Sequence, residues 1–414
     1  MQCGTNINEL PDMILAQIFV KLPWQERLEV EQVCKKWHNA GKHHSWTNFR
    51  IFNNYKYRDW TEERVTEIKP FFDRCGRHLR HLQFHGWSSE TVLSFIRTAP
   101  NVQHLKFCDV ELNDESLKML AQIVPNLKSL GFEGSLRRAE RNIGHGLMEC
   151  FKMMTCLEYL YIIDDGVLLH QHSFVQFPPN LKFFSLNGIK NTDQILNWVA
   201  KGCKDLKALC VSGVYGRINE SGFQAISQMK NLTYLDLPID RADNFDIGYV
   251  FEALIELRAL KIDTVDVKVS AAIARYCEKL EHLHLDTDDI SPKDHANLLR
   301  VASLPNFCSL AIWASSYPKE QTTELVNRQW QTSDFYGKIC QVVDEIDESD
   351  RQQSKFPKEE HPIVEVQYQG GFCGHLSTQH KWLRLKNTIS SRPNAWEKWQ
   401  SEKWQYGWLR AGKP

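Results

Sequence analysis

Apolar positions recur at a nearly constant spacing between residues 79 and 312. Each copy has two apolar anchors separated by two residues, then one intervening residue and a third anchor, as in Asn231–Leu237, which reads N-L-x-x-L-x-L. The first anchors of successive copies lie 23 to 30 residues apart, and a fixed period of this kind indicates a repeat architecture. The ten anchor sets are Leu79/Leu82/Phe84, Val102/Leu105/Phe107, Leu127/Leu130/Phe132, Leu157/Leu160/Ile162, Leu181/Phe184/Leu186, Leu206/Leu209/Val211, Leu232/Leu235/Leu237, Leu257/Leu260/Ile262, Leu280/Leu283/Leu285 and Phe307/Leu310/Ile312.

Each copy predicts a short strand followed by a helix. The last two anchors alternate with polar residues, which places the anchors on one face of a strand. A stretch of helical period follows, for example residues 115–124, which are apolar at Leu117, Leu120, Ala121 and Val124. Asn113 or Asp114 can cap that helix. We therefore expect an α/β chain in which the anchors hold the fold together and bind nothing.

The ten copies resemble the cysteine-containing leucine-rich repeats. That resemblance implies a solenoid with parallel strands on the concave face and helices on the convex face, over residues 78–313. The sequence departs from the family because its cysteines are sporadic and because the third copy carries an insertion at residues 135–146. This insertion is basic, and it is either a binding element or a solvated loop.

Residues 7–50 follow a different period. Ile14, Leu15, Ile18, Phe19 and Leu22 recur at helical steps before Pro23, and a second helical segment extends over residues 25–40. Two or three short helices cannot bury all of these apolar residues among themselves. The surplus predicts an interface with a partner.

The run Leu10-Pro11-Asp12 with the helical residues above, followed by Val33-Cys34-x-x-Trp37 and Trp46, resembles an F-box. The resemblance implies a small all-α module that docks on a Skp-type adaptor, and through it on a cullin-based ubiquitin ligase. It also implies that Val33, Cys34 and Trp37 lie partly in the core of the module. The alternative is a cap that only shields the first repeat. The implied adaptor-binding residues are Leu10, Pro11, Ile14, Leu15, Ile18, Phe19, Leu22, Cys34 and Trp37.

Residues 51–77 form a bridge in which aromatic and polar residues alternate, as at Phe52, Tyr55 and Tyr57. The alternation favours an extended segment or a degenerate first repeat. Because flexible linkers are rich in Gly and Ser, we expect a rigid connection between the module and the repeats.

The residues between the anchors are the candidates for binding a protein target on the concave face. Exposed Tyr and Phe often act as interface anchors, although here they can also stack laterally on neighbouring strands. His81 and His104 are expected on adjacent strands as exposed histidines, because no third metal ligand is evident. The candidates are His81, His104, Tyr159, Tyr161, Phe183, Tyr234, Asp236 and Trp313.

Residues 314–414 do not continue the repeat. We expect partial helix over residues 320–350 and a strand over residues 363–368. Residues 381–413 then combine eight Lys or Arg with five Trp. This last stretch favours a cap on the final repeat, with target binding or nucleic-acid binding as the alternatives.

Composition narrows the function further. Lys plus Arg (50) balance Asp plus Glu (51), which gives no overall preference for nucleic acid or membrane. The 12 cysteines form no C-x-x-C pair, and neither a signal-like segment nor an apolar stretch of about 20 residues is present. We therefore expect free thiols and a cytoplasmic or nuclear protein. No catalytic, phosphate-binding or metal-binding motif was found, so neither enzymatic activity nor a cofactor is expected.

Together these patterns predict the substrate-recognition subunit of a Skp–cullin–F-box ubiquitin ligase. In this hypothesis the module docks on the adaptor and the concave face holds a protein for ubiquitination. The alternative is a ligase-independent scaffold that binds proteins through its repeats.

Overall fold

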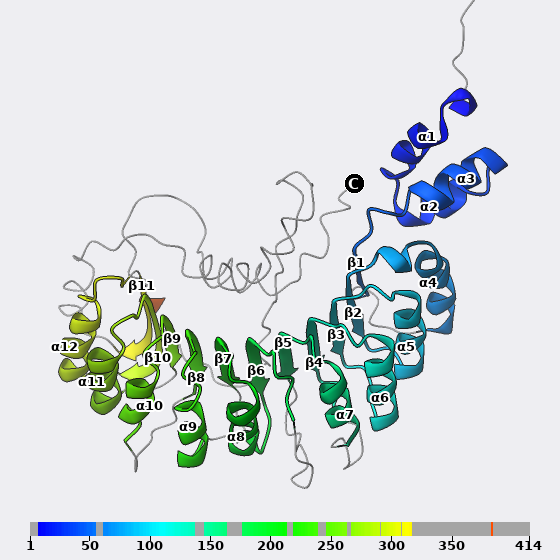
Figure 1. Cartoon of the computed structure of the whole chain (residues 1–414). Coiled ribbons are helices and arrows are strands. Elements are labelled where there is room, and N and C mark those ends of the chain that lie inside the picture. The colour runs from blue at the N-terminus through cyan, green and yellow to red at the C-terminus, as the bar shows by residue number, and fades with distance from the viewer. Residues whose placement is uncertain are drawn as a thin grey trace, which may run out of the picture. The chain divides into compact units, whose positions relative to one another are not determined.

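The computed structural model describes residues 7–54, 61–136, 145–163, 176–212, 218–238, 246–262, 266–289, 291–307, 309–316 and 382–383. The chain divides into two compact units, each of which is described by itself. The first holds residues 1–181, 187–190 and 410–414, and the second holds residues 182–186 and 191–409. Figure 1 gives the order of the helices and strands.

The first unit begins with a helical module. It consists of the 3-10 turn η1 (Ile7–Glu9) and helices α1 (Asp12–Phe19), α2 (Trp24–Val30) and α3 (Lys35–His44). Pro11 and Pro23 stand immediately before α1 and α2, where a missing N–H costs no helical hydrogen bond. Leu15 and Phe19 of α1 pack on Ala40 of α3 and form the core of the module.

The repeats of the first unit alternate strand and helix. The strands pair in parallel and in chain order, from β1 through β5. Their register places the anchors Leu82, Leu105, Leu130 and Leu160 opposite one another. The elements are β1 (Ile51–Asn53), α4 (Glu62–Cys75), η3 (Gly76–His78), β2 (His81–His85), α5 (Ser89–Thr98), β3 (His104–Cys108), α6 (Asp114–Ile123), β4 (Ser129–Glu133), α7 (His145–Met153) and β5 (Tyr159–Ile163).

The second unit repeats this organisation. Strands β7 to β11 pair in parallel and in chain order, and β12 pairs antiparallel with β11. Its elements are β6 (Phe183–Asn187), α8 (Thr192–Gly202), β7 (Ala208–Ser212), α9 (Glu220–Ile226), β8 (Tyr234–Leu237), α10 (Gly248–Ala253), β9 (Ala259–Ile262), α11 (Val267–Tyr276), β10 (His282–Asp289), α12 (Pro292–Val301), β11 (Ser309–Ser316) and β12 (Trp382–Leu383).

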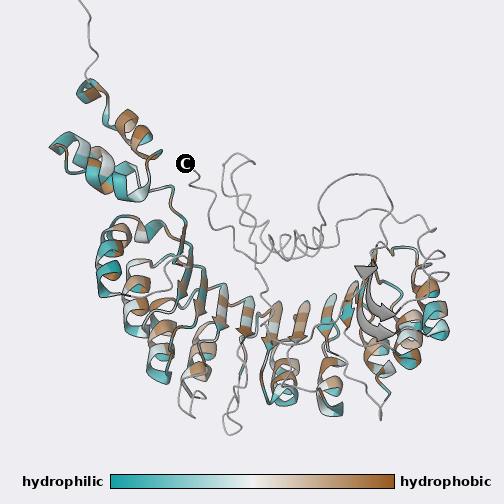
Figure 2. Ribbon diagram, turned by 180° about the vertical axis from the view of Figure 1, so that it is seen from behind, coloured by the Kyte–Doolittle hydropathy of each residue, from teal (hydrophilic) through white to brown (hydrophobic). Residues whose placement is uncertain are grey.

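The repeat anchors form the core of both units. Most leucine anchors described in the structure, among them Leu130, Leu160 and Leu235, are fully buried, whereas Leu310 of the last repeat is half-buried. The helices carry both hydrophobic and hydrophilic residues, as expected of helices with one buried face (Figure 2). The fold is that of a leucine-rich-repeat solenoid preceded by a helical module, as predicted. None of the helices in the described part of the chain is long and apolar enough to cross a bilayer.

The turns at both ends of the strands are built alike from repeat to repeat. After β2, β3, β4 and β6, the chain enters the left-handed region at Gly86, Asp109, Gly134 and Gly188. Before each strand, one carbonyl accepts two N–H groups of the next repeat. The Arg50 carbonyl, for example, accepts the N–H groups of Arg80 and His81 at 2.7 and 3.0 Å. The residue just before each strand is therefore equivalent in successive repeats.

The bridge at residues 51–77 contains both a strand and a helix. Strand β1 pairs with β2, and helix α4 follows it, so the interpretation as a degenerate first repeat fits better than that of an extended segment. Asn54 extends the ladder with its side chain, which accepts the His85 N–H at 2.7 Å and donates to the His85 carbonyl at 3.0 Å. Within the insertion at residues 135–146, residues 137–144 lie outside the described residues, as do the predicted helix and strand of the C-terminal region.

The buried carboxylate of Glu31 links the helical module to this first repeat. The Glu31 carboxylate accepts the Trp46 indole N–H at 2.7 Å and the Arg74 Nε–H of α4 at 2.9 Å. Around this pair, the Phe71 ring of α4 contacts Trp24, Trp46 and Phe49, with ring centroids 5.1 to 6.2 Å apart. The module and the first repeat thus share one core.

Candidate functional site

The helical module presents several exposed apolar side chains. Met13, Ile14 and Ile18 of α1 are 56%, 40% and 41% exposed, and Val33, just before α3, is 61% exposed. Pro11 and Cys34 are exposed as well. Isolated exposed apolar residues are common on proteins, but several on one small module indicate an interaction surface. We call Met13, Ile14, Ile18 and Val33 the module surface.

The structure corrects part of the predicted adaptor-binding set. Leu15 and Phe19 are 0% and 1% exposed, so they are core residues that a partner cannot contact directly. Leu10, Leu22 and Trp37 are half-buried and pack against that core, and the Trp37 ring lies 5.2 Å from that of Phe19. Val33 and Cys34, predicted to lie partly in the core, are exposed instead, and Met13, which was not among the candidates, is exposed as well.

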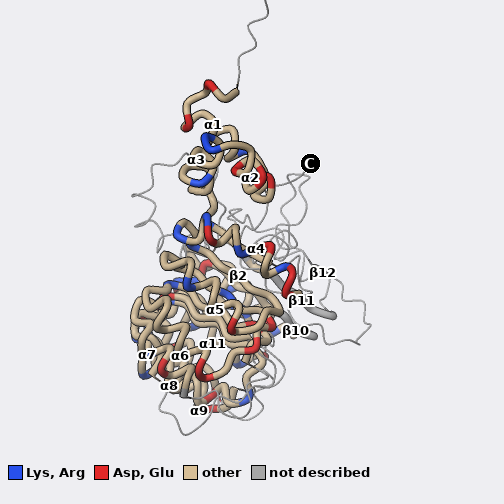
Figure 3. Tube along the Cα trace, turned by 90° about the vertical axis from the view of Figure 1, so that its right-hand side faces the viewer, with Lys and Arg blue, Asp and Glu red and all other residues tan. Residues whose placement is uncertain are grey.

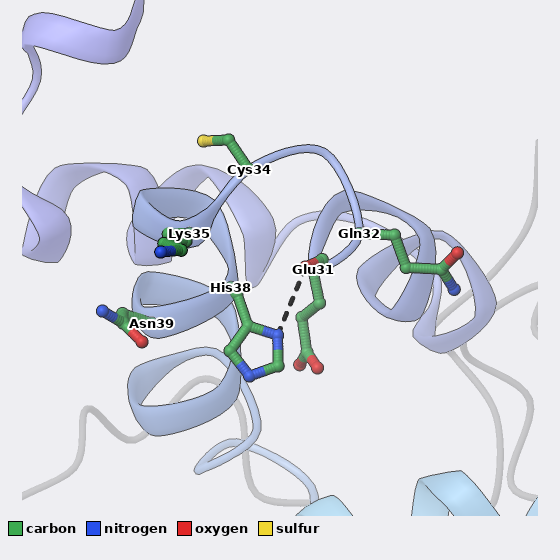
Figure 4. Close-up of a pocket in the computed structure, with 6 residues that line it drawn as sticks. All are labelled: Glu31, Gln32, Cys34, Lys35, His38 and Asn39. Atoms are coloured by element: carbon green, nitrogen blue, oxygen red, sulfur yellow. Dashed lines mark hydrogen bonds between the residues drawn. The ribbon is translucent and has the colours of Figure 1, made fainter.

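A shallow depression lies beside the module surface, between the end of α2 and the start of α3 (Figure 4). His38 Nδ1 donates to the Glu31 carbonyl at 3.3 Å across it. The Cys34 side chain caps α3, and its sulfur accepts the Trp37 N–H at 3.5 Å. The depression is lined by Glu31, Gln32, Cys34, Lys35, His38 and Asn39.

On the concave face of the first unit, His81 and His104 are stacked rather than freely exposed. Both are half-buried, their ring centroids are 4.3 Å apart, and the rings are nearly parallel, at 6°. Burial, with a smaller contribution from Arg80, lowers the pKa of His81 to about 4. Burial also lowers the pKa of His104 well below its usual value. Both imidazoles are therefore neutral at physiological pH. The two side chains were expected to be exposed, but they are half-buried.

Next to the two histidines, a chain of polar contacts crosses strands β2, β3 and β4. The Gln83 side-chain amide contacts His85 Nε2 at 2.7 Å and donates to the Cys108 sulfur at 3.5 Å. Lys106 Nζ lies 2.7 Å from Glu133 Oε2. Burial alone would raise the pKa of Glu133, but Lys106 outweighs it and the pKa is lowered. The polar side chains named here therefore have hydrogen-bond or ion-pair partners within the protein.

The second unit has a similar pair on its concave face. Lys261 Nζ lies 3.2 Å from Asp236 Oδ2. Burial raises the pKa of Asp236, although Lys261 opposes this. His284 is buried nearby, and burial together with Lys261 lowers its pKa to about 3. Asp236 is thus held by an internal ion pair, and Tyr234 is half-buried next to it in β8.

The aromatic candidates are less accessible than the sequence suggested. Tyr159 and Phe183 are 8% and 6% exposed, whereas Tyr161 is half-buried. Strands only about 4.8 Å apart bring neighbouring side chains into contact, so a large ring on this face is covered from both sides. Tyr159 and Phe183 were expected to be exposed on this face, but their side chains are buried. Trp313 lies on β11, and its side chain is outside the described residues.

Several cysteines of the described residues are buried, and their burial raises the pKa of their thiols. Burial raises the pKa of Cys108, Cys150, Cys203 and Cys277 to about 12, so these thiols stay protonated. Across the described ranges, no three His, Cys, Asp or Glu side chains are grouped to hold a metal ion. What the described geometry offers is surfaces for binding.

Comparison with known proteins gives a family match for the helical module. Residues 7–51 match the F-box-like family model. Over 288 residues the chain is 23% identical to the "Putative RNA-binding protein EEED8.10" of Caenorhabditis elegans, which covers 65% of this chain and 38% of that protein. The chain therefore spans well under half of the length of this relative.

Three solved structures show a low similarity to this chain. The TLR13–ssRNA13 complex has a TM-score of 0.40 at 19% identity, covering 59% of this chain and 34% of that chain. The Drosophila Toll–Spatzle complex has a TM-score of 0.41 at 12% identity, covering 57% and 31%. An internalin of Listeria monocytogenes has a TM-score of 0.34 at 13% identity, covering 60% and 83%. The chain combines an F-box-like module with leucine-rich repeats.

Proposed function

We propose that this protein is a substrate-recognition subunit of a Skp–cullin–F-box ubiquitin ligase. Its module binds a Skp-type adaptor, and its repeats hold a protein target for a separate conjugating enzyme. Ubiquitin transfer is then accelerated by proximity, and this chain supplies no catalytic group. This function implies a cytoplasmic or nuclear location.

The observation that carries the proposal is the module surface. Residues 7–51 match the F-box-like model, and within them Ile14 and Ile18 project from α1 while Leu15 and Phe19 fill the core. An apolar surface on a module already packed on the first repeat supports docking of a further chain, and weighs against a role limited to capping.

Co-purification with a Skp-type adaptor tests the proposal. The Ile14→Asp/Ile18→Asp variant places two charges on the module surface without altering its core, so we expect adaptor recovery to fall at least about tenfold. Ile255→Asp, at an exposed position in the second unit, is the matched control and should leave recovery unchanged. If the wild type recovers no adaptor, or if the double variant recovers as much as the wild type, the ligase role is wrong. A ligase-independent scaffold then remains.

RNA binding is the second candidate. The observation in its favour is the name of the Caenorhabditis elegans relative, and the matched stretch covers only 38% of that protein. A filter-binding titration of the full chain with single-stranded RNA tests it. If the chain binds RNA, its affinity for the RNA should fall steeply as the salt concentration is raised.

A further inference from the structure

Lysines from two successive repeats of the second unit meet at the edge of the sheet where strands β7 and β8 begin. The side chain of Asn231 donates to the Lys204 carbonyl at 2.9 Å, so Lys230, next to Asn231, lies beside Lys204. The Lys207 carbonyl accepts the Thr233 N–H at 2.8 Å, which places Lys207 against the same turn. Because neighbouring strands are only about 4.8 Å apart, the three backbones lie close together. We call Lys204, Lys207 and Lys230 the lysine edge.

The ammonium groups of the lysine edge have no carboxylate partner. Lys204 and Lys230 are exposed, Lys207 is half-buried, and none of them takes part in an ion pair of the described residues. Lys204 Nζ donates to the Ala200 carbonyl at 2.6 Å, which leaves donors of that group for a further acceptor. Asp205, within the same stretch, balances at most one of these charges.

The following repeats neutralise the same edge internally. Arg258 occupies the position equivalent to Lys207, because its carbonyl accepts the Glu281 N–H at 2.8 Å just before the next strand. The Arg258 side chain pairs with Glu281 at 2.9 Å, and Lys279 pairs with Glu256 at 2.6 Å. Figure 3 shows Lys and Arg segments interspersed with Asp and Glu segments over the repeats. The lysine edge is therefore a local excess of positive charge on a chain whose net charge is −1.

Carboxylates suit this edge better than a nucleic acid does. Lysine offers a compact point charge, whereas single-stranded nucleic acids also need aromatic side chains on which their bases stack. The segments that form the edge, residues 179–182, 204–207 and 230–233, contain no Phe, Tyr or Trp. An extended peptide places every second side chain on one face, about 6.7 Å apart, a spacing that spans lysines on neighbouring repeats.

We propose that the lysine edge is a docking site for an acidic segment of a partner protein, with unmodified Asp and Glu side chains as its ligands. The lysines precede the strands and do not belong to the concave face that holds the target in the proposed function. The inference therefore goes beyond the ligase role and does not depend on it. Charge complementarity of this kind is screened by salt, so the interaction should weaken as the salt concentration is raised.

Peptide binding by the full chain tests the site. The probe is a short fluorescent peptide in which Glu and Ser alternate, and the reference peptide has Gln in place of Glu. We expect the wild type to bind the Glu peptide at least about tenfold more tightly at low salt, with a preference that shrinks at high salt. In Lys204→Gln/Lys207→Gln/Lys230→Gln this preference should disappear.

A charge-matched control separates the site from the charge of the whole chain. Lys268→Gln/Lys293→Gln/Arg300→Gln removes the same number of positive charges from exposed positions on α11 and α12, and it should keep the preference. The assignment is overturned if the wild type shows no preference, if the lysine-edge variant keeps it, or if the control variant loses it.

A single substitution guards against misfolding of the triple variant. Lys230→Glu reverses the charge of one exposed side chain, so we expect weaker binding of the Glu peptide and an unchanged thermal melting curve. Unchanged binding by a folded Lys230→Glu variant would contradict the site. Adaptor recovery by both lysine variants should equal that of the wild type, because the module surface is intact.

Two other occupants of the edge would replace the proposal. Stronger binding of oligouridine than of the Glu peptide would mean that RNA binds there. The chain also has an acidic run of its own at residues 344–350, with five carboxylates. If the Glu peptide bound only after these carboxylates were changed to amides, the occupant would be this chain itself, and docking of a partner protein would be wrong.

Discussion

Glu31 is the residue on which the connection between the module and the first repeat depends most directly. Its side chain is buried, and its two oxygens are used by Trp46 and Arg74. A side chain at Gly41 would bring its Cβ within 2.7 Å of Glu31 Cγ, so the glycine keeps the space that this carboxylate needs. A buried carboxylate of this kind stabilises the protein only while its partners remain.

Arg74→Met should therefore destabilise the protein, because it leaves the Glu31 carboxylate buried with one donor fewer. We expect a loss of about 1–3 kcal/mol in the free energy of unfolding, measured by urea denaturation. Arg97→Met, at an exposed position on α5, is the control and should change stability by less than about 0.5 kcal/mol. Equal effects of the two substitutions would show that the pairing does not matter.

His284 predicts how the second unit responds to acid. Its folded-state pKa is lowered to about 3, while an unfolded histidine takes up a proton near pH 6.5. Between these values the unfolded state binds more protons, so stability is lost as the pH falls through this window. His284→Gln should flatten the dependence by at most about 1.4 kcal/mol per pH unit. Urea denaturation at several pH values measures it, with Ile255→Gln, at an exposed position of the second unit, as a control that should keep the wild-type slope.

At the scale of single elements, each strand contributes anchors that only the stack of neighbouring strands can bury. Leu130 of β4 is fully buried and lies in register with Leu105 and Leu160. Leu130→Ala should cost about 2–5 kcal/mol and lower the thermal midpoint. Ile255→Ala, at an exposed position, should cost almost nothing. A stable Leu130→Ala variant would mean that the sheet closes over the cavity.

The anchors predicted the strand register because a period-2 pattern leaves only one face to bury. The helix start at Asn113 was also predicted, and Asn113 forms a capping box in the structure, as Ser291 does before α12. The strand and helix of the first repeat were harder to predict. Strand β1 has only three residues, and α4 contains Pro70, which interrupts the pattern expected of a helix.

The candidate site was predictable as a module but not residue by residue. Helix α1 carries two adjacent stripes at helical spacing, Ile14 with Ile18 and Leu15 with Phe19, and both are apolar. Which stripe is buried depends on where α3 packs. The spacing of apolar residues in the sequence does not show this position.

At the scale of the whole first unit, the module packs directly against the first repeat. Phe71 and Phe72 of α4 contact aromatic rings on both sides, from Trp24, Trp46 and Phe49 of the module to Phe84 and Phe95 of the next repeat. Aromatic contacts of this kind each contribute about 0.5–1.5 kcal/mol beyond their buried area. Point substitutions on the module surface are therefore better probes of adaptor binding than removal of the module.

Deleting residues 1–50 should loosen the first repeat as well as abolish adaptor binding. The deletion exposes one side of Phe71 and removes the Glu31 partner of Arg74, so α4 loses both its packing and its ion pair. Hydrogen–deuterium exchange should then show faster exchange over residues 62–75, while helix α11 of the second unit, at residues 267–276, exchanges as before. Ile14→Asp/Ile18→Asp, which leaves these contacts intact, should show neither change. If exchange at α4 were unaffected by the deletion, the module and the repeat would not share a core, and a flexible connection would have to replace the rigid one.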